Sequence, residues 1–213
     1  MKTILYFVRH GESQGNAARL FLGHTNLDLT QKGHQQAECT AEYLNDINAD
    51  VIYSSDLLRA YNTAKHAAEK RGMTIVTNKN LREIYAGKWE NRLFSDIEVE
   101  YAQSYHIWRN DVGNARPDDG ESVAELQKRI VDEVTKIAIE NIGRTVFIFT
   151  HATPIRTFKA FCDGKSCDEI KDIPWASNAS VSVAQYENGS FKMTEYGTDY
   201  FLDMVKTTLP PNV

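Results

Sequence analysis

The sequence predicts an α/β protein: a three-layer α/β/α sandwich around a mostly parallel sheet of about six strands, with one antiparallel edge strand. Two observations carry this prediction. Short runs rich in β-branched and aromatic residues, at 3–8, 50–54 and 145–149, are typical of strands that are buried on both faces of a parallel sheet. Helical patterns with an apolar stripe follow these runs, and this alternation is what βαβ units produce.

Composition limits the domain count and the partners. No linker or charge run divides the 213 residues, so we expect a single domain over 1–213. Lys and Arg total 24 against 29 for Asp and Glu, so there is no basic field to attract nucleic acid or an anionic membrane. The apolar run at 4–8 is too short for a signal peptide or a membrane span. Because the three cysteines lack metal-ligand spacing, we expect reduced thiols and a cytoplasmic protein; the sequence also allows a homodimer.

The first strand leads directly into the letters RHGES at 9–13. Open α/β sheets bind ligands at the carboxyl ends of their strands. Arg9 offers a planar fork of donors that matches two phosphate oxygens, and His10 suits a neutral nucleophile near pH 7. A structural histidine without catalytic work is the alternative. Asn16 either adds donors to the same pocket or belongs to a turn.

Two helices flank the second strand, 50–54. Thr30 is predicted to cap the first of them. Arg59 falls in the first turn of the second helix, where a cation opposes the helix dipole. Arg59 therefore either binds an anion beside the helix start or lies exposed over its own helix.

Glu83 follows a third predicted strand, 73–76, and lies between Leu81 and Ile84. A carboxyl group among apolar side chains holds its proton more readily, as a general acid must. A surface glutamate in a loop is the alternative reading of Glu83.

The segment at about 91–120 is predicted to be a lid or side wall over a pocket. Its aromatic residues either line a leaving-group pocket or pack the lid itself. After it, Ser122 and Glu125 have the spacing of a capping box that opens a long helix. The aromatic residues are Phe94, Tyr101, Tyr105 and Trp108.

His151 repeats the placement of His10, because it follows the strand at 145–149 and precedes a helix. Thr153 is predicted to cap that helix, with Pro154 in its first position. Right-handed crossovers keep parallel strands pointing the same way, so we expect both histidines at one sheet edge. Runs at 181–186 and 191–196 around the letters ENGS predict a hairpin at a sheet edge.

Taken together, the chain resembles the histidine phosphatase superfamily, in its phosphoglycerate mutase-like branch. The matching motifs occur in the family's order and span most of the chain. They are RHGES at 9–13 with Asn16, SSDLLRA at 54–60, LRE at 81–83 with GKWE at 87–90, GES at 120–122, and His151 with Ile155 and Arg156.

The resemblance implies a phosphoglycerate mutase-like fold and a phosphohistidine intermediate on His10. Arg9, Arg59 and His151 would hold the phosphoryl oxygens, and Glu83 would protonate the leaving oxygen and later activate water. It implies no metal and no cofactor, because the protein's own cations neutralise the phosphoryl group. The residues expected to bind the substrate are Arg9, Asn16, Gly23, Arg59, His151 and Ala152.

Two departures from the family pattern bear on function. Ala152 stands where the family usually has glycine, which costs about 1 kcal/mol if that backbone needs a positive φ. The chain also lacks the substrate residues of true mutases. We therefore expect a metal-independent phosphomonoesterase for a small phosphorylated metabolite. A phosphoglycerate mutase and an inactive module that binds a phospho-ligand are the alternatives.

Overall fold

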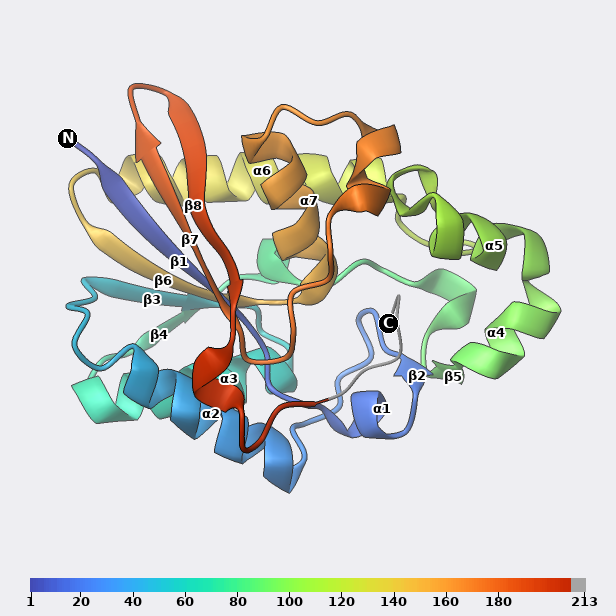
Figure 1. Cartoon of the computed structure of the whole chain (residues 1–213), viewed down its shortest axis with the longest axis horizontal. Helices are drawn as coiled ribbons and strands as arrows, with labels where there is room; N and C mark the ends of the chain where they lie inside the picture. The colour runs from blue at the N-terminus through green and yellow to red at the C-terminus, as the bar shows by residue number, and fades with distance from the viewer. Residues whose placement is uncertain (208–213) are drawn as a thin grey trace.

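A computed structural model of the chain describes residues 1–207 and contains one six-stranded sheet (Figure 1). The end of the predicted domain, 208–213, lies outside the described residues. The strand order is β4-β3-β6-β1-β7-β8. The bounds are β1 Thr3–Arg9, β3 Val51–Ser54, β4 Ile75–Thr77, β6 Thr145–Thr150, β7 Val181–Glu187 and β8 Ser190–Thr198; β2 Leu20–Phe21 and β5 Arg92–Leu93 pair separately.

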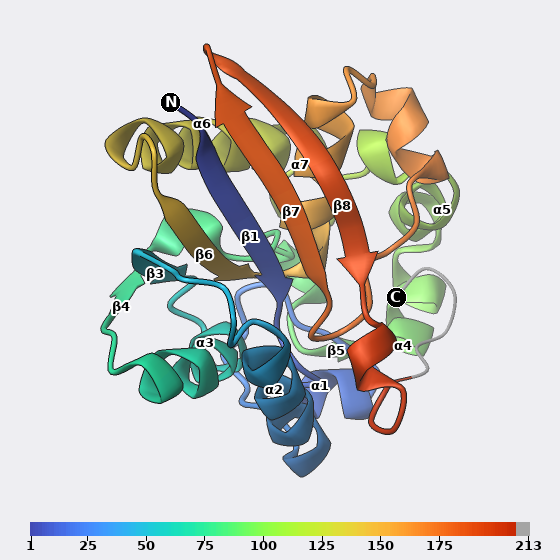
Figure 2. The same ribbon diagram turned by 60° about the vertical axis from the view of Figure 1, so that its left-hand side comes forward.

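The predicted fold class is confirmed, with two corrections to the strands. The antiparallel strand is β7, which lies between β1 and β8 and is therefore not at the edge (Figure 2). Asn188 and Gly189 turn the chain with φ of 52° and 80°, so β8 returns parallel to β1. The third strand begins at Ile75 rather than at residue 73.

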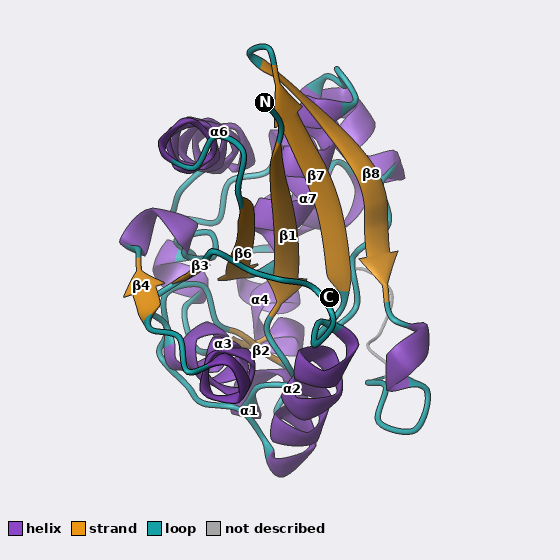
Figure 3. Cartoon of the chain, turned by 90° about the vertical axis from the view of Figure 1, so that its left-hand side faces the viewer, coloured by secondary structure: helices purple, strands orange, loops and turns teal. Residues whose placement is uncertain are grey.

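Helices cover both faces of the sheet (Figure 3). α2 and α3 pack together on one face, and α6 and α7 pack together on the other. This is the three-layer arrangement that the sequence predicts. The helix bounds are α1 Gln14–Ala17, α2 Gln31–Tyr43, α3 Leu58–Arg71, α4 Phe94–Glu100, α5 Ala102–Asn110, α6 Val123–Glu140 and α7 Ala152–Cys162.

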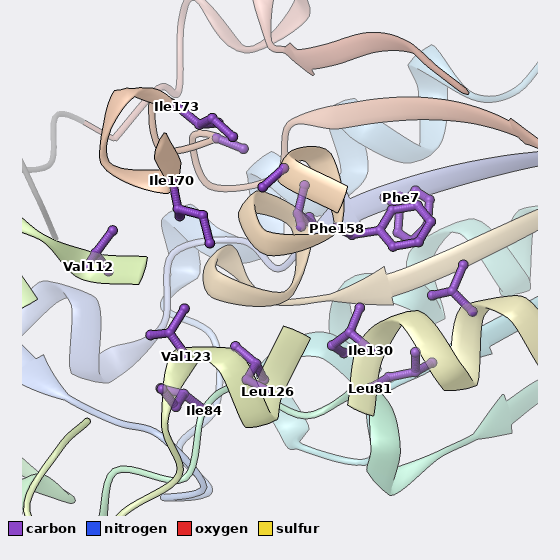
Figure 4. Packing of buried hydrophobic residues seen from close by; sticks show 14 of the residues in the cluster. Phe7, Leu81, Ile84, Val112, Val123, Leu126, Ile130, Phe158, Ile170 and Ile173 are labelled. Atoms are coloured by element: carbon purple, nitrogen blue, oxygen red, sulfur yellow. The ribbon is translucent and has the colours of Figure 1, made fainter. Parts of the chain in front are cut away.

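Side chains of β1 point alternately to the two faces of the sheet, and both faces are covered, which explains why this strand carries no charge before Arg9. Leu5 and Phe7 belong to the hydrophobic cluster that includes residues of α6 and α7, where Phe7 lies near Phe158 (Figure 4). Val8 belongs to the second cluster, with residues of α2 and α3. Both faces of the strand are therefore apolar, and packing on both sides holds β1, and with it Arg9 at its end, in a fixed position.

The helix starts agree with the sequence except at α7. Thr30 caps α2, and Ser122 forms the predicted capping box of α6. α7 begins at Ala152 with His151 as its N-cap, so the prediction of Thr153 as the cap is wrong. The reason is that the amide of Thr153 donates to the Glu83 carboxylate, at 3.3 Å. A distant side chain thus supplies the oxygen at this helix start.

The segment at 91–120 contains α4, α5 and the 3-10 helix Val112–Asn114. Tyr105 is buried against the ring of Trp89 and belongs to the main core cluster. None of the helices among residues 1–207 combines the length and the apolar character needed to cross a membrane.

Candidate active site

The two histidines meet at the carboxyl edge of the sheet, as the strand directions predict. His10 follows β1, and His151 follows the neighbouring strand β6. Their ring centroids are 5.1 Å apart, with the rings edge to face. Arg9, the last residue of β1, and Arg59, in the first turn of α3, are buried at the same edge.

His10 presents one ring nitrogen to the site. Its Nδ1 lies 2.7 Å from the carbonyl oxygen of Gly11, which can only accept, so Nδ1 carries the proton. The lone pair of the neutral ring is therefore on Nε2. Burial and the charges of Arg59 and Arg9 lower the pKa of His10 well below its usual value, so the ring is neutral near pH 7.

His151 carries its proton on the opposite side, because of Ser55. The Ser55 hydroxyl oxygen accepts from the amide of Leu57 and lies 2.9 Å from Nε2 of His151. The hydroxyl hydrogen has no other acceptor among residues 1–207, so it is assigned to Nε2 and the ring proton to Nδ1. This Nδ1 is buried and has no hydrogen-bond partner among residues 1–207. It is a donor available to a ligand.

Arg9 and Arg59 are buried cations with no carboxylate of residues 1–207 in direct contact, although Glu83 lies near enough to raise the pKa of both, as does Glu90 for Arg59. Neither forms an ion pair within residues 1–207. Arg9 donates to the carbonyl of Ala176, and Arg59 donates to those of Gly23 and Thr25. Burial lowers the pKa of each guanidinium to about 10, so both remain charged at pH 7. Unpaired buried charge is costly, and an anion would compensate it.

Glu83 lines a pocket together with Arg9 and Arg59, but its surroundings differ from the prediction. Its carboxylate is half-buried and accepts from the amides of Ile84, at 2.8 Å, and Thr153. Sequence neighbours could not reveal this, because the amide of Thr153 is brought in by α7. The sequence predicted apolar surroundings for Glu83, and this is wrong: two backbone N–H groups donate to its carboxylate.

An ion pair from α6 holds the chain around Glu83. Arg129 pairs with Glu121 through two hydrogen bonds, at 2.9 and 2.8 Å. The same guanidinium donates to the carbonyls of Asn80, Arg82 and Glu83. Arg129 therefore holds the backbone of Glu83 and of the residues before it in place.

The remaining predicted binding residues lie around the same pocket. Asn16 uses its Oδ1 to accept from Ser13 and Asn178, which leaves its Nδ2 donor for a ligand. Gly23 has a φ of 48°, and its carbonyl holds Arg59. Ala152 does not have a positive φ, so the strain considered for this position does not arise. Asn178, which also donates to the carbonyl of His10, carries no signal in the sequence.

A pocket with a cavity volume of about 70 Å³ lies beside these groups, and the rings of His10 and His151 are not among the described residues that line it. Of the four aromatic residues predicted for the lid, Phe94 and Trp108 line it, whereas Tyr101 and Tyr105 do not. Sequence reasoning missed Phe21 and Trp175, because they come from segments that show no chemical pattern, and it gave Thr153 a role only as a helix cap. The lining residues are Arg9, Asn16, Leu20, Phe21, Leu22, Gly23, Arg59, Glu83, Phe94, Trp108, Ala152, Thr153 and Trp175.

Acid should destabilise the protein through the two buried histidines. Burial and nearby guanidinium charge, chiefly Arg59, lower the pKa of His10 and of His151 well below 6.5. Below a pH of about 6.5 the unfolded chain therefore binds protons that the folded chain does not. The free energy of unfolding should fall there by up to about 1.4 kcal/mol per pH unit for each histidine. The measurement is the free energy of unfolding in urea at several pH values between 7.5 and 5. It should fall less steeply with pH in His151→Asn than in wild type or in the exposed control His106→Asn. The same pH dependence in all three proteins would contradict this.

Comparison with known proteins identifies the class. The model of the histidine phosphatase superfamily (branch 1) matches residues 5–199, so the chain belongs to this family and the predicted resemblance is confirmed. Phosphoserine phosphatase 1 of Hydrogenobacter thermophilus is 29% identical over 184 residues, 86% of each chain. Adenosylcobalamin/alpha-ribazole phosphatase of Salmonella typhimurium is 33% identical over 147 residues, 69% of this chain and 73% of that protein.

The solved structures agree with this assignment. YhfR of Bacillus stearothermophilus superposes with a TM-score of 0.90 at 28% identity, covering 94% of this chain and 99% of the other. Proteins named as probable phosphoglycerate mutases also match part of the chain.

Proposed function

We propose that the protein is a phosphomonoesterase that hydrolyses a small phosphorylated metabolite through a phosphohistidine on His10. One observation carries the proposal: two buried, unpaired guanidiniums lie beside a neutral histidine whose Nε2 lone pair is free. Cations without a counter-ion suit a phosphoryl dianion, and the free lone pair suits attack on phosphorus.

In the first step, Nε2 of His10 attacks phosphorus and the bond from phosphorus to the ester oxygen breaks. Glu83 gives a proton to the departing alkoxide, while Arg9, Arg59 and Nδ1 of His151 hold the remaining phosphoryl oxygens. In the second step, water attacks phosphorus and passes a proton to the Glu83 carboxylate. The electron pair of the broken P–N bond returns to Nε2, and inorganic phosphate leaves.

The phosphatase is favoured over the two alternatives. Relatives named as a phosphoserine phosphatase and an alpha-ribazole phosphatase support hydrolysis of small esters. A phosphoglycerate mutase must bind a carboxylate in addition to the phosphoryl group, and among residues 1–207 the pocket lining offers no cation besides Arg9 and Arg59. The inactive module rested on strain at Ala152, which does not arise. The cytoplasm is the location we propose, in keeping with the three free cysteines.

Phosphate release in the presence of a metal chelator tests this function. We expect the purified protein to release phosphate from 4-nitrophenyl phosphate and from at least one alkyl phosphate. A parallel assay with 3-phosphoglycerate follows formation of 2-phosphoglycerate with a bisphosphorylated primer. Isomerisation without phosphate release would move the assignment to a mutase, and no change in any ester would refute the phosphatase.

A further inference from the structure

The pocket has two chemically different halves. Arg9, Asn16, Arg59, Glu83 and Thr153 form the polar half, where the proposed reaction takes place, and Thr153 contributes the amide that donates to Glu83. The other half is apolar. It consists of Leu20, Phe21, Leu22, Phe94, Trp108 and Trp175.

Four rings of the apolar half support one another; we call Phe21, Phe94, Trp108 and Trp175 the aromatic wall. Phe21 packs edge to face on Trp108 at 5.0 Å between centroids and lies 5.5 Å from Phe94. Trp108 stacks on Trp175 at 6.2 Å. Interlocked rings lose little freedom when a ligand arrives, so the wall is preorganised for an apolar group.

Trp175 is fixed from outside the pocket as well. The guanidinium carbon of Arg156 lies 4.1 Å from its ring centroid, a cation–π contact. Arg156 is itself buried and donates to the carbonyl of Lys171. Arg156 does not line the pocket, so its charge stabilises the wall rather than offering a ligand a partner.

The charge distribution excludes an anionic leaving group. Both cations of the lining, Arg9 and Arg59, belong to the phosphoryl half. The third ionisable side chain of the described lining, Glu83, is acidic, so it offers the carboxylate of a leaving group no ion pair. A leaving group with a carboxylate would lose its hydration against apolar rings and gain no ion pair there.

Building on the proposed phosphatase, we propose that the substrate is a phosphomonoester of an uncharged alcohol with an apolar, preferably aromatic, body. The aromatic wall binds that body and the two guanidiniums bind the phosphoryl group. Esters whose alcohol carries a carboxylate, such as phosphoserine and 3-phosphoglycerate, are poor substrates of this site.

The test compares two alkyl esters with similar chemical reactivity, 2-phenylethyl phosphate and O-phosphoserine. We expect kcat/KM to favour 2-phenylethyl phosphate by about tenfold to a hundredfold. Phe94→Ala should lower kcat/KM for 2-phenylethyl phosphate by about tenfold, while inhibition by inorganic phosphate stays unchanged. Val99→Ala, an exposed apolar change in the same helix α4, is the matched control and should alter neither value.

A gain of function completes the test. Leu20→Lys places a cation in the apolar half, so it should raise kcat/KM for O-phosphoserine relative to 2-phenylethyl phosphate. If wild type turns over O-phosphoserine as well as 2-phenylethyl phosphate, the inferred substrate class is wrong and the phosphatase stands. If neither these esters nor 4-nitrophenyl phosphate releases phosphate, the proposed phosphatase itself is refuted.

Discussion

His10→Ala should reduce phosphate release to the background rate, a loss of about a millionfold, because no other group can form the covalent intermediate. In the structure, Nε2 of His10 is the atom with a free lone pair, since Nδ1 donates to the carbonyl of Gly11. The measurement is phosphate release together with labelling of the protein by a ³²P-ester after rapid quenching. Wild type should carry an acid-labile label that the variant lacks.

The matched control is His106→Ala, which removes an exposed histidine of α5 and should leave both turnover and labelling unchanged. Circular dichroism and the melting temperature establish that the His10 variant is folded. A folded His10→Ala protein that still turns over ester, or that still becomes labelled, would contradict the assignment of His10 as nucleophile.

Glu83→Gln should damage catalysis selectively, according to the alcohol that leaves. Poor leaving groups need a proton as the P–O bond breaks, so we expect losses of about a hundredfold to ten-thousandfold for alkyl phosphates. 4-Nitrophenolate leaves without a proton, so kcat/KM for 4-nitrophenyl phosphate should fall far less. The measurement is kcat/KM across esters of increasing alcohol pKa, which should give a steeper dependence in the variant.

The exposed carboxylate Glu98 supplies the control, because Glu98→Gln changes the same chemical group on α4 outside the pocket lining. Its dependence on the leaving group should match wild type. Equal losses on alkyl and aryl esters in Glu83→Gln would indicate a role in positioning or folding rather than in proton transfer.

The sequence could predict the parts of the site that strands position. His10 and His151 end buried parallel strands, so the direction of the strands alone brings them to one edge. Arg59 lies at a helix start, where a cation is unfavourable unless an anion is near, and for this reason the sequence indicated Arg59 as a candidate anion ligand. In each case a rule that spans a few residues carried the prediction.

Contacts between distant segments could not be predicted in this way. Ser55 sets the proton of His151 across 96 positions of sequence, and Thr153 reaches Glu83 across 70. Trp175 carries no motif, and it lines the pocket although it comes from the irregular segment between α7 and β7. The proposed substrate class depends on such contacts, which is why the motifs alone left it open.

The two unpaired guanidiniums also govern what happens after the reaction. We expect Arg9 and Arg59 to bind the phosphoryl group through its charge, which the released phosphate shares with the ester. Free phosphate therefore competes with substrate for the site, and product inhibition is built into its electrostatics. By mass action the same binding favours the folded chain, so the protein gains stability from its own product.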